Sequence, residues 1–233
     1  MTGKRMLIDT SKCTACRGCM VSCKQWHSLP AEDTVFTGTY TNPPDNSGAN
    51  LTVIKFTEAE VSGKLRFLFF NNRCRHCHTP FCKGACPLSP KAVIRQNNGI
   101  VRIDPALCQP DICAVDGVKP CQAACPYGIP KRTYVKDGAP VETVMRKCDF
   151  CFNRFGNTDL PLASQKPSCM VTCPPGAIMV GPADTILKKA KRRRNKLIAQ
   201  GFSNANVYPP QGTSTYKSHV VWVLTELPEV YGL

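Results

Sequence analysis

The pattern of apolar and polar positions along this chain predicts a small number of short strands. Apolar residues are concentrated at residues 51–56 and 65–70, which we expect to pair as an edge hairpin joined through Ser62-Gly63. A final strand is expected at Val220–Leu224, where five apolar residues follow one another. Between these segments, residues 28–50 are rich in turn-forming residues, so we expect irregular structure there.

One long helix is predicted near the end of the chain. Asp184 is expected to cap it, and Gly201 follows its last turn. The spacing of apolar residues predicts one buried face, formed by Ile186, Leu187, Ala190, Leu197 and Ile198. The basic run at residues 188–196 is expected to be a solvated face of the helix rather than a binding site.

Composition changes this picture, because the chain has few residues with which to build a core. Of its 233 residues, 16 are Cys, 16 are Gly and 20 are Pro, while aromatic residues make up 8%. Much of the backbone must therefore be loop and turn. A core of this kind needs additional stabilisation, either from disulfides or from bound metal.

The cysteines are arranged regularly, in four quartets that each end with three residues between the last two cysteines. No cysteine is left over. The quartets are Cys13, Cys16, Cys19 and Cys23; Cys74, Cys77, Cys82 and Cys86; Cys108, Cys113, Cys121 and Cys125; and Cys148, Cys151, Cys169 and Cys173. The third quartet has wider gaps than the usual compact form, and three quartets close with Cys-Pro.

Four cysteine quartets could form disulfides, bind zinc or hold iron–sulfur clusters, and the first two are the alternatives to the third. Disulfides are typical of secreted proteins, but residues 1–11 contain no apolar segment or small-residue cleavage site of an export signal. The longest apolar runs have the length of strands, so we expect a soluble chain without its own transmembrane helix. Zinc sites generally use two cysteine pairs separated by a longer span, which compact quartets do not match. The histidines, His27, His76, His78 and His219, are expected not to be ligands.

The formal charge of +14 suggests nucleic acid as a partner, but this charge changes when metal binds. Metal-bound cysteines are thiolates and add sixteen negative charges, while four oxidised cubane cores of roughly +2 each return about +8. The charge that is left, about +6 by this count, is weak support for nucleic-acid binding.

The run C-x2-C-x2-C-x3-C at Cys13–Cys23 indicates a particular chemistry. In two-cluster ferredoxins such a run gives three ligands to one cluster, and its fourth cysteine ligates the other cluster. The sequence therefore predicts four [4Fe–4S] clusters, one for each quartet. No nucleotide-binding or nucleophile motif is present, and no cysteine is left for catalysis, so no catalytic residue is predicted.

Beyond the quartets, ACPYGIPKR at 124–132 and RKCDFCFNR at 146–154 resemble the four-cluster ferredoxin-like subunits of molybdenum or tungsten pterin oxidoreductases. Residues 13–32, the NPPD at 42–45 and FLFFNNRCRHC at 67–77 look like the small subunit of soluble, two-subunit formate dehydrogenases. The resemblance covers nearly the whole chain.

This resemblance implies an α+β fold of two interleaved ferredoxin-like modules with an inserted hairpin and a C-terminal helix. Module A would comprise 1–27 and 145–183, module B 71–135, the insertion 28–70, and the C-terminal helix and strand 184–233. It also implies that the modules exchange ligands. The four ligand sets would be Cys13, Cys16, Cys19 and Cys173; Cys148, Cys151, Cys169 and Cys23; Cys74, Cys77, Cys82 and Cys125; and Cys108, Cys113, Cys121 and Cys86.

In function, the resemblance implies an electron-transfer subunit that serves a large catalytic subunit with a molybdenum or tungsten bis-pterin site. Electrons would pass to a cytochrome or another carrier, and formate dehydrogenase is the leading identity. A sulfur-compound or arsenate oxidoreductase is the alternative within this class, and a zinc-dependent nucleic-acid-binding protein is the alternative outside it. We expect a periplasmic location through export with the partner, with a cytoplasmic location as the alternative.

Overall fold

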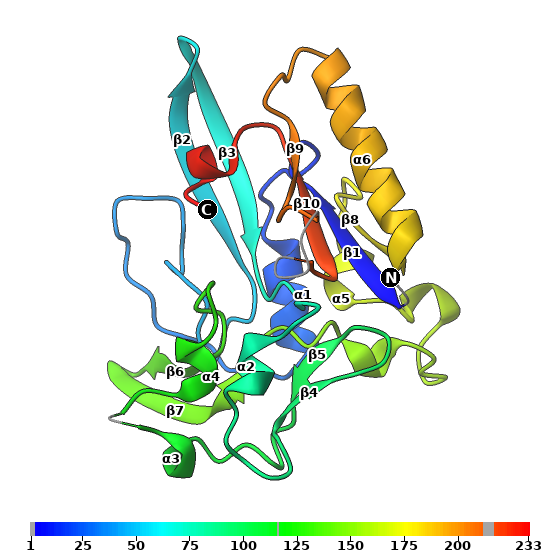
Figure 1. The fold of residues 1–233 in the computed structure, drawn as a ribbon. Helices are drawn as coiled ribbons and strands as arrows, with labels where there is room; N and C mark the ends of the chain where they lie inside the picture. Colours follow the sequence, from blue (N-terminus) through cyan, green and yellow to red (C-terminus); the bar gives the residue numbers. More distant parts are fainter. Residues whose placement is uncertain (1–2, 116, 212–216) are drawn as a thin grey trace.

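The computed structural model describes residues 3–115, 117–211 and 217–233, and it mixes helices and strands along the chain (Figure 1). Its central sheet has four strands in the order β8-β1-β10-β9. Strand β1 (Lys4–Asp9) runs parallel to β10 (Val220–Leu224) and antiparallel to β8 (Ile178–Pro182). The fourth strand, β9 (Asn206–Tyr208), pairs with β10. The expected final strand is therefore confirmed, and it lies inside the sheet rather than at its edge.

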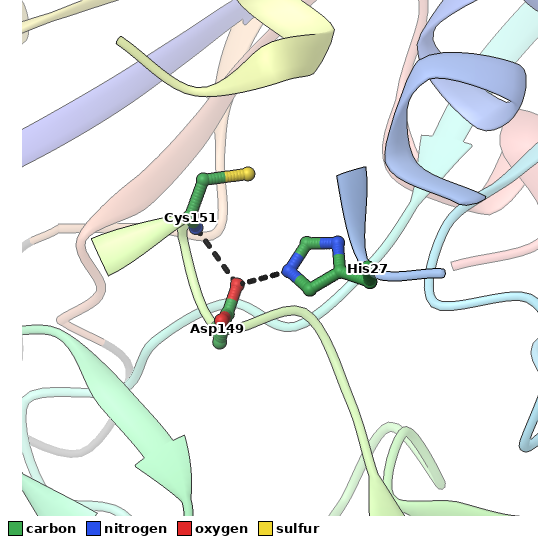
Figure 2. Close-up of side chains that lie close together, drawn as sticks. All are labelled: His27, Asp149 and Cys151. Atoms are coloured by element: carbon green, nitrogen blue, oxygen red, sulfur yellow. Dashed lines mark hydrogen bonds and ion pairs between the residues drawn. The ribbon is translucent and has the colours of Figure 1, made fainter. Parts of the chain in front are cut away.

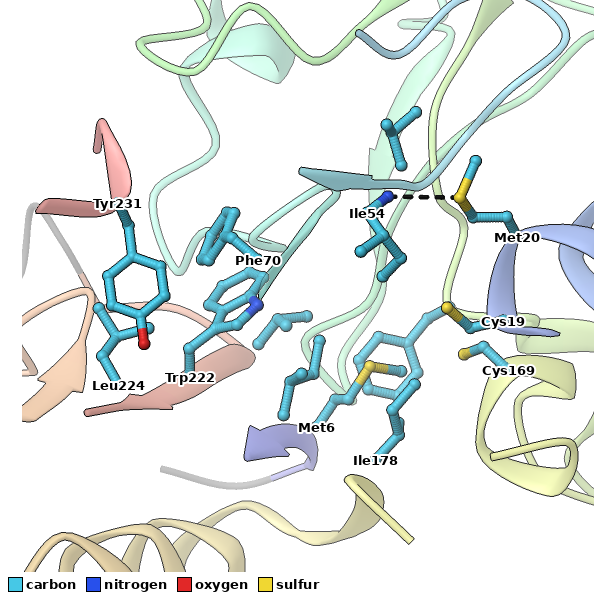
Figure 3. Packing of buried hydrophobic residues seen from close by; sticks show 14 of the residues in the cluster. Met6, Cys19, Met20, Ile54, Phe70, Cys169, Ile178, Trp222, Leu224 and Tyr231 are labelled. Carbon is cyan, nitrogen blue, oxygen red and sulfur yellow. Dashed lines mark hydrogen bonds between the residues drawn. The ribbon is translucent and has the colours of Figure 1, made fainter. Parts of the chain in front are cut away.

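The two faces of this sheet carry different parts of the core, because successive side chains of a strand point to opposite faces. Leu7, Val221 and Val223 pack on one face against helix α6 (Ala183–Ala199). Met6, Ile8, Val220, Trp222 and Leu224 point to the other face, where two of the cysteines, Cys19 and Cys169, join the apolar cluster (Figure 3). All five residues of β10 are buried, which explains its uninterrupted apolar sequence.

Helix α6 agrees with the prediction in its position but differs in two details. The N-cap position is occupied by Pro182, so Asp184 lies in the first turn and does not cap the helix. An acidic residue there still interacts favourably with the helix dipole. Ile186, Ala190 and Leu197 are buried as expected, whereas Leu187 is only half-buried. Ile198 is 44% exposed, because it directly follows the buried Leu197 and is therefore rotated by about 100° around the helix axis.

The expected hairpin is confirmed as β2 (Val53–Val61) and β3 (Lys64–Asn72), which turn at Ser62 and Gly63. Both turn residues have positive φ, of 53° and 70°, as a two-residue hairpin turn requires. The strands are longer than predicted because residues 57–61 and Lys64 continue the pairing towards the exposed tip, while Asn71 and Asn72 continue it at the base. Residues 28–50, all within the described part of the chain, form turns and bends rather than helices or strands.

The remaining elements are short and lie mostly between cysteines. Several of them gather at the end of the molecule away from the hairpin tip (Figure 1). They are α1 (Gly18–Trp26), α2 (Phe81–Gly84), β4 (Val93–Arg95), β5 (Val101–Ile103), α3 (Pro110–Cys113), α4 (Pro120–Ala123), β6 (Lys131–Lys136), β7 (Ala139–Arg146), α5 (Ser168–Val171) and the 3-10 turns Phe152–Arg154, Leu162–Ser164 and Pro228–Tyr231. Across the described residues, no helix combines the length and the apolar character that a membrane span needs.

Candidate iron–sulfur centres

All sixteen cysteines lie in the described part of the chain, and none of them forms a disulfide. Most are buried or half-buried, and they gather in four places. We call these group a (Cys13, Cys16, Cys19, Cys173), group b (Cys23, Cys148, Cys151, Cys169), group c (Cys74, Cys77, Cys82, Cys125) and group d (Cys86, Cys108, Cys113, Cys121).

Group a surrounds a cavity next to the central sheet. Cys13, Cys16, Cys19 and Cys173 all line this cavity, together with apolar residues that include Ile8, Ile54 and Ile178. The loop that carries the first two cysteines bends through Ala15 and Arg17, whose φ angles are 53° and 60°. Such left-handed positions curl the backbone around a centre, and helix α1 then begins at Gly18 and buries Cys19. The main-chain N–H of Ala177 donates to Cys173 Sγ at 3.3 Å.

Group b begins one helical turn beyond Cys19. Residues 19 and 23 lie on the same side of α1, one turn apart. Cys23 therefore lies beyond group a on that side of the helix, next to Cys148, Cys151 and Cys169. Burial raises the pKa of the Cys148 thiol to about 11 and raises that of Cys23 well above its usual range. The first quartet therefore contributes its first three cysteines to one group and its fourth to another.

Group c and group d show the same exchange. Cys125, the last cysteine of the third quartet, lies beside Cys74 and Cys77 of the second quartet. Cys86, the last cysteine of the second quartet, lines a cavity together with three cysteines of the third quartet, Cys108, Cys113 and Cys121. Helices α2 and α4, which carry Cys82 and Cys121, pack against each other between the two groups.

The protonation of these thiols bears on which ligand they fit. Burial raises the pKa of Cys19, Cys77 and Cys121 to about 12, and that of Cys82 to about 11. Thiols of this kind stay protonated at neutral pH unless a bound cation stabilises the thiolate. Four sulfur donors around an apolar centre, with main-chain N–H groups directed at sulfur, fit an iron–sulfur cluster.

Two buried cations lie among the groups. Burial alone would lower the pKa of Arg73, but neighbouring Cys169, Cys148 and Cys19 outweigh this effect and raise it. In Lys147 burial is likewise outweighed by Cys74, Cys82 and Cys148, and its Nζ donates to the main-chain oxygen of Cys148 at 3.0 Å. Sequence reasoning missed both cations. The available signal was that each directly precedes the first cysteine of a quartet.

Three of the four histidines form hydrogen bonds away from the centres of the cysteine groups, although His27 Nδ1 also lies 3.7 Å from Cys23 Sγ. Figure 2 shows His27 beside Asp149, with Nε2 and Oδ1 2.9 Å apart. The same carboxylate oxygen accepts from the main-chain N–H of Cys151 at 2.8 Å. Although the ligand atoms of His27, Asp149 and Cys151 lie within 4.8 Å of one another, the carboxylate is already engaged. These hydrogen bonds of Asp149 hold the end of α1 against the loop of the fourth quartet. His76 Nδ1 accepts from the N–H of Val101 at 3.0 Å, and His219 Nδ1 lies 2.7 Å from the Lys4 carbonyl oxygen.

Comparison with known proteins identifies the family. Residues 65–183 match the 4Fe-4S dicluster domain. The iron–sulfur subunit of the nitrate-inducible formate dehydrogenase of Escherichia coli is 37% identical over 97% of this chain and 70% of its own length. The beta subunit of formate dehydrogenase 2 (cytochrome c-553) of Nitratidesulfovibrio vulgaris is 36% identical over 98% of this chain and 96% of its own length. This chain belongs to the family of formate dehydrogenase iron–sulfur subunits.

Membership of the formate dehydrogenase iron–sulfur subunits confirms the resemblance seen in the motifs. It makes the chain an electron-transfer subunit of an oxidoreductase complex and not its catalytic subunit. It also removes the basis for the zinc alternative, because the matching domain is an iron–sulfur domain. A more distant relative, which belongs to the sulfite dehydrogenase of Allochromatium vinosum, is 29% identical over 91% of this chain.

Proposed function

We propose that this chain carries electrons through four [4Fe–4S] clusters between a catalytic subunit with a molybdenum or tungsten bis-pterin site and an external carrier. Formate is the proposed substrate of that catalytic subunit. The observation that carries the proposal is that all sixteen cysteines gather in four groups of four, in a member of the formate dehydrogenase iron–sulfur subunits.

Each group is proposed to hold one cluster. The exchange of the fourth cysteine supports this arrangement, because it is the ligand pattern of two-cluster ferredoxins. The exchange also supports two interleaved modules: α1 and α5, from distant parts of the chain, pack together around groups a and b. Groups c and d take all their cysteines from residues 74–125, one continuous stretch of sequence, and Cys82, Cys86, Cys108 and Cys121 pack in one apolar cluster with residues of β4 and β5.

The groups are proposed to form a line in the order a, b, c, d. Cys19 of group a is close enough to Cys169 of group b for their charges to interact. The same holds for Cys148 and Cys74, which join b to c. Cys121 and Cys82 join d to c. A line of this kind has two ends, so one end would receive electrons from the catalytic subunit and the other would deliver them.

The identities of the partners rest on the relatives. A relative whose name includes cytochrome c-553 supports a cytochrome as the external carrier. The sulfite dehydrogenase relative supports a second candidate, in which the same chain serves a sulfur-compound oxidoreductase. Export together with the catalytic subunit to the periplasm is also part of the proposal, and cell fractionation tests it.

The decisive experiment removes this chain from the purified complex. Formate oxidation is then measured with a small dye, which can reach the catalytic subunit directly, and with the native carrier. We expect dye reduction to persist and carrier reduction to be lost. Undiminished reduction of the native carrier would refute the electron-transfer role. Activity with sulfite in place of formate would leave that role intact and change only the substrate.

A further inference from the structure

Two polar side chains at the end of β3 connect a cysteine of group a to a cysteine of group b. Asn71 Nδ2 donates to Cys19 Sγ at 3.2 Å, and its Oδ1 accepts from Arg73 Nε at 2.7 Å. Arg73 Nη1 then donates to Cys169 Sγ at 3.2 Å. Figure 3 shows Cys19 and Cys169 next to each other in the buried cluster. We call the pair Asn71 and Arg73 the amide–guanidinium bridge.

The bridge is held rigidly by its surroundings. Asn71 is 2% exposed and Arg73 is 1% exposed. Thr52 Oγ1 donates to Asn71 Oδ1 at 2.9 Å, which leaves the amide N–H directed at Cys19. The indole N–H of Trp222 donates to the main-chain oxygen of Asn71 at 3.1 Å and fixes the backbone. Neither side chain can turn away from its sulfur without leaving a buried polar group unpaired.

The charge of Arg73 is compensated in an unusual way. Its side chain bonds to Asn71 Oδ1, to Cys169 Sγ and to Met6 Sδ, the last at 3.0 Å. Among the described residues, no carboxylate forms an ion pair with it. A buried guanidinium that stays protonated needs a negative partner. The thiolates of the cysteines named here would supply that charge once they bind metal.

We propose that the amide–guanidinium bridge sets the reduction potentials of the clusters held by groups a and b. This inference rests on the ligand sets of the proposed function. Reduction adds negative charge that the apolar surroundings disfavour. A fixed positive charge and N–H groups at the sulfurs stabilise the reduced form and raise its potential. Because one pair of side chains contacts both groups, the two potentials rise together.

The test compares variants of this chain in the purified complex by redox titration with electron paramagnetic resonance. Arg73→Gln removes the charge. Asn71→Asp is isosteric and keeps the acceptor for Arg73 and Thr52. It removes the N–H at Cys19, and its negative charge compensates the positive charge of the Arg73 guanidinium. For each variant we expect two of the four potentials to fall. The expected change in the reduction equilibrium is about tenfold, or about 59 mV for a one-electron couple.

Two further variants serve as controls. Arg5→Gln makes the same chemical change at an arginine that is also 1% exposed but donates to the main-chain oxygens of Ser218 and Ala183. It should leave all four potentials unchanged. Arg73→Lys keeps a positive charge near group b, so it should restore part of the potential lost in Arg73→Gln.

Iron content and the number of clusters in the unaltered complex test the proposed ligand sets separately. If groups a and b hold no clusters, the proposed function fails and the inference falls with it. If the variants keep four clusters with unchanged potentials, only the inference is overturned. If Arg73→Gln loses iron, the reduction potentials of Asn71→Asp provide the test of the inference. Loss of iron from both, or an equal shift in Arg5→Gln, would show a general structural role and would also overturn the inference.

Discussion

Helix α6 is joined to the start of the first cysteine loop by an ion pair between a partly buried arginine and a buried carboxylate. Arg193 Nε lies 2.8 Å from Asp9 Oδ2, and its Nη2 donates to Ser11 Oγ at 2.7 Å. Asp9 is 1% exposed, and its other carboxylate oxygen accepts from the main-chain N–H of Ser11. Arg193 is thus an exception within a basic run that sequence reasoning interpreted as a solvated face. The contact fixes the segment that leads into Cys13.

We predict that Arg193→Met weakens this region strongly, because it leaves a buried carboxylate without its cation. Breaking a buried pair in this way costs about 3–5 kcal/mol. Arg193 is itself 24% exposed and Ser11 remains bonded to Asp9, so we expect the lower end, about 3 kcal/mol. If the contact is broken in the transition state for unfolding, the whole loss of stability appears in the unfolding rate. Unfolding then accelerates by roughly a hundredfold, at 1.36 kcal/mol for each factor of ten.

The assay follows the loss of visible cluster absorbance in guanidinium chloride. Arg192→Met is the matched control, because Arg192 is exposed on the same helix and its loss should change stability by no more than about 0.5 kcal/mol. Replacing the carboxylate as well, in Asp9→Asn with Arg193→Met, should recover much of the lost stability. If Arg193→Met behaves like Arg192→Met, or the double variant recovers nothing, the buried charge is not the cause.

Three further predictions concern metal content and packing. Iron analysis should give about sixteen atoms per chain, four for each cluster, and a reproducible value near twelve would mean that one group, most simply that of the widened third quartet, holds no cubane. Cys125→Ser should remove the resonance signal of group c, and loss of the group d signal instead would contradict the exchanged ligands. Gly99→Ala should destabilise the fold by at least about 3 kcal/mol, because its φ is +89° and an added Cβ would lie 2.0 Å from the His219 ring. In the control Gly138→Ala, with a φ of +73° and nothing within 4 Å, thermal melting should show a clearly smaller loss.

Local patterns in the sequence were sufficient to predict several of the helices and strands. The hairpin was predictable because two apolar runs flank Ser62 and Gly63, and both its strands and its turn depend on neighbouring residues. Helix α6 was predictable from its 3.6-residue period. The cap was not, since Pro182 ends β8 immediately before the helix and leaves no turn in which Asp184 could act.

Contacts between distant residues were not predictable from these patterns. An apolar run such as Val220–Leu224 predicts a buried strand, but its periodicity does not predict that this strand pairs with Lys4–Asp9. Spacing made the quartets evident, whereas the expectation that the fourth cysteines are exchanged came from the family. Arg73 and Lys147 were overlooked because the sequence contains thirty lysines and arginines, and their burial depends on packing.

The order of strands in the central sheet has a consequence for biosynthesis. Strand β1 is synthesised before both of its neighbours, β8 and β10, which lie far downstream in the sequence. Cys13, Cys16 and Cys19 are therefore made long before Cys173 and before the strands that cover them. Until β8 and β10 have been synthesised, these thiols have no sheet to shield them. Iron that reached the chain before these strands existed would meet an open loop, so the strand order favours insertion of the group a cluster after β8 and β10 have formed.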